Sequence, residues 1–290
     1  MNTKELLQKV KEIEIKTRGL TRHVFSGDYH SAFKGKGMTF SEVRDYSFGD
    51  DVRQLDWNVT ARFNEPFIKV FEEERELTVM LICDISGSTN FGTKSRNKKE
   101  LMLELCAVLA FSAVANKDKV GALLVTEKVE KFIPPKKGRS HAMRILRDLI
   151  EHQPEVTTTN LNEGVKYLSN VINKRSIVFV LSDFFDDNDF IEGLKIANRR
   201  HDLVALKLND EAERELPKAG IIQLLDVETK QRKWVNTYSS TVRKKYKTDY
   251  LKSEERLFES FRKSRIDYAA ISTDSHYLNA LMLLFKKRGK

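Results

Sequence analysis

The feature that most constrains this chain is a continuous apolar run, residues 79–83, that ends in Asp-x-Ser-x-Ser at Asp84, Ser86 and Ser88. Five consecutive apolar residues are typical of a strand that is buried on both faces, as in a parallel sheet. In open α/β sheets, ligands bind where the strands end. Carboxylate and hydroxyl oxygens are the ligands that hard cations such as Mg²⁺ prefer. The stretch therefore predicts one half of an oxygen-lined metal site at the edge of a sheet.

Strand and helix patterns alternate along the chain after Glu72. We expect strands at residues 77–83, 120–126, 129–133, 177–181, 203–208 and 268–272, helices at 97–115, 142–151, 161–172, 190–199, 241–264 and 277–287, and a hairpin from 221–227 and 233–236. This alternation predicts an α/β fold with a mostly parallel sheet flanked by helices. Before Glu72, short alternating segments and a strand at 67–71 predict a small β-rich subdomain, preceded by an amphipathic helix within residues 1–20. We therefore expect two domains, residues 1–75 and 76–290.

Two later segments could supply the second half of the metal site. Thr159 precedes the helix expected at 161–172, and the apolar strand at 177–181 leads to Asp183. Because parallel strands end at the same edge of a sheet, these two residues can converge with Asp84, Ser86 and Ser88. Each side chain taken singly could be a helix cap or a turn former, but the ordered set favours a metal site. Two carboxylates and three hydroxyls leave Mg²⁺ incompletely neutralised, so a carboxylate from a partner could complete its coordination.

The ordered set Asp-x-Ser-x-Ser, Thr and Asp resembles the metal-ion-dependent adhesion site of von Willebrand factor A domains. The resemblance implies that Ser86 and Ser88 bind the ion directly, Thr159 directly or through water, and Asp84 and Asp183 mainly through water. It implies Mg²⁺, with Mn²⁺ or Ca²⁺ as alternatives. The family pattern of Thr, an apolar residue and a small residue at the helix start selects Thr159 over the preceding threonine. One departure is local, because bacterial members often carry Met where this chain has a threonine after Ser88.

The resemblance extends upstream. Residues 29–40, 42–46, 49–62 and 71–76 resemble the signature of the bacterial family catalogued as domain of unknown function 58, in which the signature runs directly into a von Willebrand A-like domain. The resemblance implies a chaperone-like assembly or stress-related role with a MoxR-type AAA+ ATPase as partner, and with other von Willebrand A-domain proteins as further partners. The opposite charges within the signature favour an ion-pair and turn network over a docking surface, with Asp50 and Asp51 capping a short helix.

Three enzyme classes fit the same stretch less well. A Walker A phosphate loop needs Lys directly after the second Gly of its motif, and Thr93 separates Gly92 from Lys94 here. An Asp-x-Asp phosphatase needs a second acid where this chain has Ser86. A serine hydrolase needs a nucleophilic serine with a histidine partner, but the sequence contains no Gly-x-Ser-x-Gly motif and none of its histidines has a motif partner. We therefore expect a protein-binding module that is not an enzyme and has no small-molecule substrate.

The positive charge is concentrated at the C-terminal end of the sequence. The chain carries 51 Lys+Arg and 42 Asp+Glu, a net charge of +9, and residues 231–290 hold 15 basic and 6 acidic residues, or 15 − 6 = +9. This segment gives an alternative function, binding to nucleic acid or to an acidic surface. A solvated helix face is the favoured interpretation over nucleic acid, because no aromatic platform or base-reading motif accompanies the charge.

The remaining composition bounds the compartment. The chain lacks an apolar run of the ~18 residues that a membrane helix needs, and its first 20 residues lack the apolar core of a signal peptide. We expect a cytoplasmic protein, with any membrane association peripheral and through partners. The two cysteines, Cys83 and Cys106, fall in an apolar strand and on an apolar helix face, which predicts structural burial rather than redox or metal chemistry.

Overall fold

The computed structural model describes residues 39–72, 76–93, 96–186, 189–225 and 231–288. The amphipathic helix expected within residues 1–20 lies outside these ranges, as does the part of the family signature before residue 39. The chain forms two compact units, one spanning residues 34–77 and the other containing residues 78–290.

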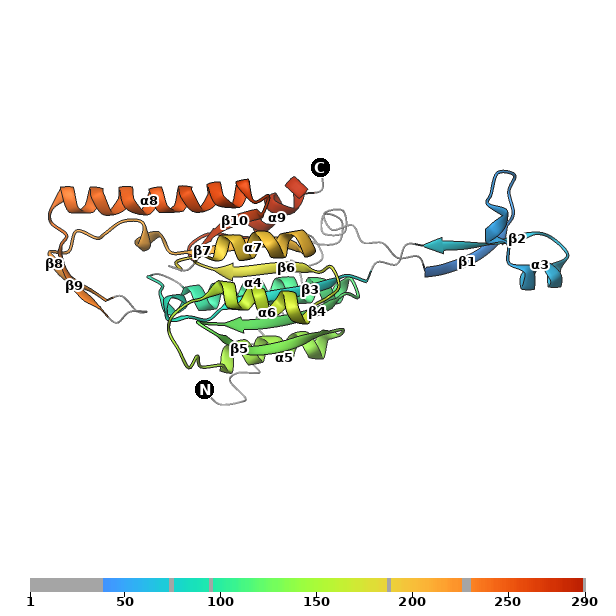
Figure 1. Ribbon diagram of the computed structural model, residues 1–290, viewed down its shortest axis with the longest axis horizontal. Coiled ribbons are helices and arrows are strands. Elements are labelled where there is room, and N and C mark those ends of the chain that lie inside the picture. Colours follow the sequence, from blue (N-terminus) through green and yellow to red (C-terminus); the bar gives the residue numbers. More distant parts are fainter. Residues whose placement is uncertain (1–38, 73–75, 94–95, 187–188, 226–230, 289–290) are drawn as a thin grey trace. The chain divides into compact units, whose positions relative to one another are not determined.

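The larger unit is built on a six-stranded sheet (Figure 1). Its strand order is β10-β7-β6-β3-β4-β5, with β3 at Thr78–Asp84, β4 at Lys119–Val125, β5 at Val129–Lys136, β6 at Ile177–Ser182, β7 at Asp202–Asn209 and β10 at Asp267–Ser272. Four of the neighbouring pairs are parallel, and only the edge pair β4–β5 is antiparallel. The expected mostly parallel α/β sheet is therefore confirmed.

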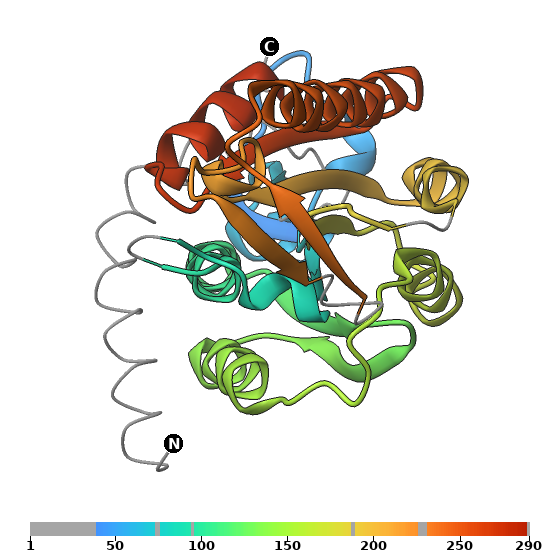
Figure 2. The same cartoon turned by 90° about the vertical axis from the view of Figure 1, so that its left-hand side faces the viewer.

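Helices cover both faces of this sheet. They are α4 at Lys98–Ala115, α5 at Arg139–Glu151, α6 at Leu161–Val171, α7 at Phe190–Arg200, α8 at Ser240–Lys263 and α9 at Tyr277–Arg288. Figure 2, which looks along the strands, shows α4, α5 and α9 on one face and α6, α7 and α8 on the other. A sheet covered on both faces requires strands without a polar face, and all six residues of β6 and the last six of β3 are buried.

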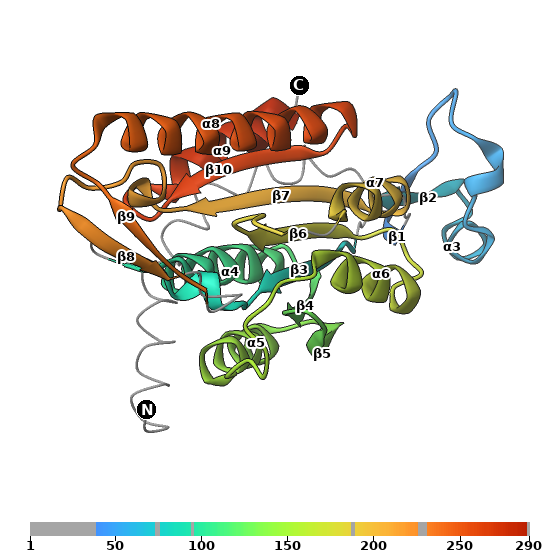
Figure 3. The ribbon, with the colours of Figure 1, turned by 60° about the vertical axis from the view of Figure 1, so that its left-hand side comes forward.

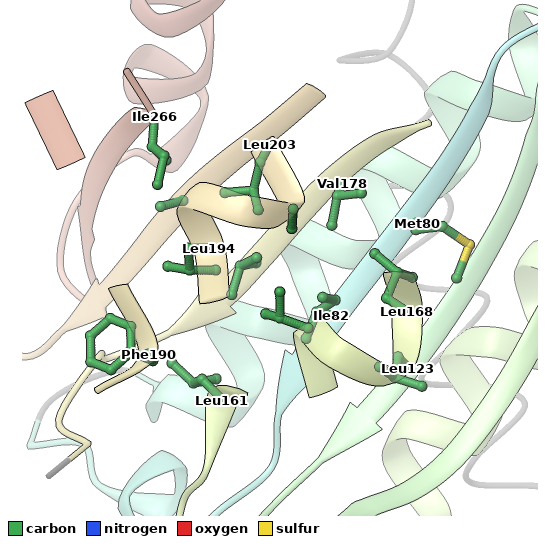
Figure 4. Packing of buried hydrophobic residues seen from close by; sticks show 14 of the residues in the cluster. Met80, Ile82, Leu123, Leu161, Leu168, Val178, Phe190, Leu194, Leu203 and Ile266 are labelled. Carbon is green, nitrogen blue, oxygen red and sulfur yellow. The ribbon is translucent and has the colours of Figure 1, made fainter. Parts of the chain in front are cut away.

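The main hydrophobic cluster fills the space between the sheet and α6, α7 and α8 (Figure 4). Alternate strand residues such as Met80, Ile82 and Val178 meet Leu168 of α6 and Leu194 of α7, all of them buried. On the opposite face, α4 is buried along most of its length. This packing makes the strand ends rigid, and the loops that follow β3 and β6 therefore start from fixed positions.

The larger unit also carries the expected hairpin, formed by β8 at Ile221–Leu225 and β9 at Arg232–Asn236. Figures 1 and 3 both place it beyond the ends of β6 and β7. The hairpin follows β7 through a short 3-10 helix, η3, at Glu211–Glu213.

The smaller unit is a two-stranded antiparallel sheet with short helices. The two strands are β1 at Thr39–Asp45 and β2 at Phe67–Glu72, which pair with each other. The chain between them forms the 3-10 helix η1 at Val52–Gln54 and the helix α3 at Trp57–Phe63. As expected, Asp51 caps a short helix, and Asp56 caps α3. Arg44 donates two hydrogen bonds to Asp50, at 2.9 and 2.8 Å. The described charges of the signature thus include the ion pair and the caps that the sequence favours.

Candidate metal centre

The site begins at the last residue of β3. The register pairs the residues before Asp84 and Ser182, so these two side chains leave the sheet next to each other. Ser182 donates its hydroxyl hydrogen to Asp84 Oδ2 at 2.6 Å, and the Ser86 backbone N–H donates to Oδ1 at 3.0 Å. Asp84 is completely buried. Its carboxylate is therefore fixed in one orientation by the neighbouring strand and by its own loop.

Burial and the charge of Asp183 raise the pKa of Asp84 to about 7, against the opposing effect of the hydrogen bonds from Ser182 and Ser86. A buried carboxylate with a raised pKa is a group whose charged form is poorly compensated. A cation near Asp84 would supply this compensation. The electrostatics of the strand end therefore favour binding of a positive ion.

Two hydroxyl oxygens lie side by side in the loop after β3. Ser86 Oγ and Ser88 Oγ are 3.1 Å apart and share a hydrogen bond. Thr89 donates to the Ser86 carbonyl oxygen at 2.7 Å within the short 3-10 helix η2, Gly87–Asn90, which fixes the loop. Ser86 is fully buried and Ser88 is half-buried. The hydroxyl pair is therefore accessible on the Ser88 side, where a cation could enter from the solvent.

The loop that carries Thr159 lies against the same segment, because the Gly87 N–H donates to the Thr157 carbonyl oxygen at 2.9 Å. Thr159 is buried, with 5% of its surface exposed. The preceding Thr158 donates its hydroxyl hydrogen to Glu127 at 2.8 Å. Of the two candidate threonines, Thr159 is therefore the buried one, in a segment that contacts the serine loop through Thr157.

Asp183 follows β6 and is held on both oxygens. Its Oδ1 accepts the Phe185 N–H at 3.1 Å, and its Oδ2 accepts a hydrogen bond from the Lys98 ammonium at 2.7 Å. Phe184 has φ of 57°, a left-handed conformation that is costly for a bulky residue. Its N–H donates to Ser182 Oγ at 2.9 Å. This tight turn brings Asp183 back towards the end of β3, where its charge acts on Asp84.

The structure thus brings Asp84, Ser86, Ser88 and Asp183 together, and places Thr159 in the adjoining loop. Sequence reasoning missed Ser182, Lys98 and Glu213 as members of the cluster. Ser182 could have been inferred, because it ends β6 next to Asp84 in the register.

The donor set fits a hard cation. Within the ranges that the structure describes, no group of three or more His, Cys, Asp or Glu side chains is arranged to hold a metal ion. An ion at the end of β3 would therefore depend on hydroxyl oxygens together with two carboxylates. Such oxygen ligands suit Mg²⁺, Mn²⁺ or Ca²⁺ better than Zn²⁺, which prefers nitrogen and sulfur.

The mostly parallel six-stranded sheet covered by helices is a von Willebrand A-like α/β fold. A family model described as "Protein of unknown function DUF58" matches residues 42–256, and the chain belongs to that family. An uncharacterized protein of Mycobacterium tuberculosis is 28% identical over 227 residues, which are 78% of this chain and 72% of that protein. An uncharacterized protein of Mycobacterium bovis matches to the same extent.

Solved structures are similar to this chain at low sequence identity. An aerotolerance-related membrane protein from Bacteroides fragilis has a TM-score of 0.50 and 13% identity, covering 73% of this chain and 99% of that chain. The conserved hypothetical protein BatB from Bacteroides thetaiotaomicron has a TM-score of 0.47 and 14% identity, covering 73% and 98%. The SpRpn10 VWA domain has a TM-score of 0.41 and 10% identity, covering 73% and 95%. Among the described residues of the present chain, no helix combines the length and apolar character needed to cross a membrane.

Proposed function

We propose that this protein is a non-enzymatic binding module that captures a partner protein through a Mg²⁺-assisted site at the end of β3. The observation that carries the proposal is Asp84, a fully buried carboxylate beside the hydroxyl pair of Ser86 and Ser88. The hydroxyls of Ser86, Ser88 and Thr159 would hold the ion, and Asp84 and Asp183 would balance its charge. When bound, the ion supplies a Lewis-acid position for a carboxylate of the partner. Mn²⁺ and Ca²⁺ are alternative occupants.

The hydrogen bonds of the site support binding rather than catalysis. A serine nucleophile needs a base that takes its proton, but the hydroxyl of Ser86 shares its hydrogen bond with Ser88. Asp84 accepts from a hydroxyl and a backbone amide, and Asp183 accepts from an amide and an ammonium. Both acids are therefore engaged as hydrogen-bond acceptors within the chain, which fixes their positions around a bound ion.

The partner class follows from the family resemblance and from the chemistry of the site. The resemblance implies a MoxR-type AAA+ ATPase, with other von Willebrand A-domain proteins as further partners, in chaperone-like assembly or stress-related processes. A partner that uses an exposed Asp or Glu would complete the coordination of the ion. We propose this combination, an acidic side chain on an ATPase partner, as the recognised element.

The proposal is tested by measuring the affinity for a purified MoxR-type ATPase by biolayer interferometry, in Mg²⁺ and in EDTA. We expect the Kd to rise at least about tenfold in EDTA, the equivalent of roughly 1.4 kcal/mol, with the same rise in Mg²⁺ for Asp84→Ala and for a Ser86→Ala/Ser88→Ala variant. Ser240→Ala, at an exposed serine, is the matched control and should bind like the wild type. An affinity that is indifferent to EDTA and to the site variants would sink the proposal.

Binding of nucleic acid or an acidic surface through residues 231–290 is the second candidate. It is favoured by Lys244, Lys245 and Lys252, which are exposed on α8. Other basic side chains of the segment are used within the chain, since Lys247 pairs with Glu215 and Arg243 donates to backbone carbonyls. Steep loss of DNA or RNA binding with rising salt would support this candidate, and absence of binding at low salt would remove it.

A further inference from the structure

A buried ammonium group lies inside the candidate metal centre. Lys98 is the first residue of α4, and only 1% of its surface is exposed. Its Nζ lies 2.7 Å from Asp183 Oδ2 and 2.6 Å from Glu213 Oε1, and 6.0 Å from the centre of the Phe91 ring. One of the two acids that would balance a metal ion is therefore already paired with a cation of the protein itself.

The placement of this lysine is unfavourable by itself. A positive charge in the first turn of a helix opposes the helix dipole, and a buried ammonium loses its hydration. The two carboxylates compensate for both effects, because an ion pair removed from water is stabilised only when its partners are close and well oriented. Lys98 is thus held at this point by Asp183 and Glu213 rather than by the preference of the helix.

Glu213 holds the ammonium from the second side. It lies in η3, and its Oε2 accepts the Asp210 N–H at 3.0 Å while its Oε1 accepts from Lys98. Asp210 is itself tied to Thr93 and Thr273 by side-chain hydrogen bonds of 2.7 Å each. The lysine therefore cannot swing away from Asp183 without disrupting the connection between η3, the loop after β3 and the end of β10.

We propose that Lys98 is a positioning residue that holds Asp183 away from a metal ion and keeps the affinity of the site for divalent cations low. The proposal rests on the metal site proposed above. A divalent cation near Asp183 meets a resident positive charge at short range, where burial makes repulsion strong. The ammonium group of Lys98 neutralises part of the negative charge of the site. The acidic side chain of a bound partner would restore that negative charge. Metal and partner would then bind tightly only together, and each would raise the affinity of the other to the same extent.

The test measures direct binding of Mn²⁺ to the full chain, with the concentration of free Mn²⁺ determined by electron paramagnetic resonance. Lys98→Met should bind Mn²⁺ at least about tenfold more tightly than the wild type, because Asp183 becomes available. Glu213→Gln should bind it more weakly, because Lys98 then pairs with Asp183 alone. Lys252→Met removes one exposed positive charge elsewhere and should bind like the wild type.

The double variant Lys98→Met/Glu213→Gln separates positioning from simple charge counting. It removes one positive and one negative charge, so the local net charge is the same as in the wild type, yet Asp183 is released. We expect tighter Mn²⁺ binding than in the wild type. The double variant also leaves one unpaired acid rather than two, so it remains informative if Lys98→Met alone does not fold.

Mn²⁺ binding by the folded double variant that is equal to or weaker than wild-type binding would overturn the role of Lys98 and leave the metal site standing. If neither lysine variant folds, the Glu213→Gln variant decides, and unchanged or tighter binding there would overturn the role. If no folded variant and no wild-type protein binds Mn²⁺, both the role of Lys98 and the metal site are wrong. Tight binding to the wild type that Lys98→Met does not improve would also count against the inference.

Discussion

Asp210 offers a quantitative test of how the loop after β3 is held. The side chain is fully buried, and its two oxygens accept four hydrogen bonds, from the Thr93 hydroxyl at 2.7 Å, the Thr93 N–H at 3.2 Å, the Thr273 hydroxyl at 2.7 Å and the Ala212 N–H at 2.9 Å. Asp210→Asn keeps the shape of the side chain. However, the amide nitrogen cannot accept, so the backbone N–H that donates to the oxygen it replaces loses its partner, and the threonine hydroxyl at the same oxygen must change from donor to acceptor.

The expected cost follows from this loss. A hydrogen bond to a charged group contributes about 1.5–3 kcal/mol, and the three remaining groups also lose the charge of their partner, so the substitution costs about 3 kcal/mol or more. For a unit of this size, 1 kcal/mol corresponds to roughly 2–4 °C in Tm, which predicts a decrease of about 6–12 °C for Asp210→Asn. Thermal unfolding followed by circular dichroism measures it, with Asp249→Asn on the exposed face of α8 as the matched control.

The pH dependence gives a second readout. Burial acts to raise the pKa of Asp210, but the hydrogen bonds from Thr273, Thr93 and Ala212 outweigh it and lower the pKa below its usual value. A group with a lowered folded-state pKa stabilises the protein above its unfolded pKa, near 3.9, and loses this contribution as the pH falls through the folded value. The difference in Tm between the wild type and Asp210→Asn should therefore shrink in acid. A decrease in Tm for Asp210→Asn at pH 7 that is no larger than the decrease for Asp249→Asn would refute the reasoning.

Three further predictions concern the larger unit. Burial lowers the pKa of His201, whose two ring nitrogens have no hydrogen-bond partner among the residues that the structure describes, so stability should fall as the pH drops below about 6.5. His201→Leu should reduce the dependence of Tm on pH in this range. An unchanged pH dependence would contradict the assignment of this effect to His201. Gly164→Ala should lower Tm, because the added Cβ would lie 2.7 Å from Val125 Cγ2. An increase, the usual result inside a helix, would show that this contact is absent. Cys83 and Cys106, both free and fully buried with their sulfurs 3.4 Å apart, should react with a thiol reagent only on unfolding, and rapid labelling of the native protein would count against their burial.

Much of the larger unit could be predicted from the sequence, because its central strands β3, β4, β6 and β7 are buried on both faces and are therefore largely apolar runs. The strand expected at 77–83 is found at Thr78–Asp84, and the helix expected at 97–115 begins one residue later, at Lys98. In the smaller unit, α3 was not predicted. Its seven residues lack an apolar stripe, and the structure shows none of them buried. Such a short helix depends on its caps rather than on periodicity.

The cluster around Asp84 was predictable only in part. Residues that follow parallel strands share an edge, so Asp84 and Asp183 could be paired from the sequence. Lys98 lies at helical spacing from Leu101 and Leu105, so its burial has a local signal, but its partners do not. Glu213 reaches Lys98 from a turn 115 residues along the chain, and only the tertiary fold brings them together.

The most direct test of the central claim is a crystal structure of the protein soaked in Mn²⁺, with anomalous scattering used to locate the ion. The account predicts a peak bonded to the hydroxyl oxygens of Ser86 and Ser88, at about 2.0–2.3 Å and close to Thr159. This peak should be absent from a Ser86→Ala/Ser88→Ala crystal treated identically. Absence of an anomalous peak at the end of β3 from both wild-type and Lys98→Met crystals, or Mn²⁺ bound only elsewhere, would contradict the proposed metal centre.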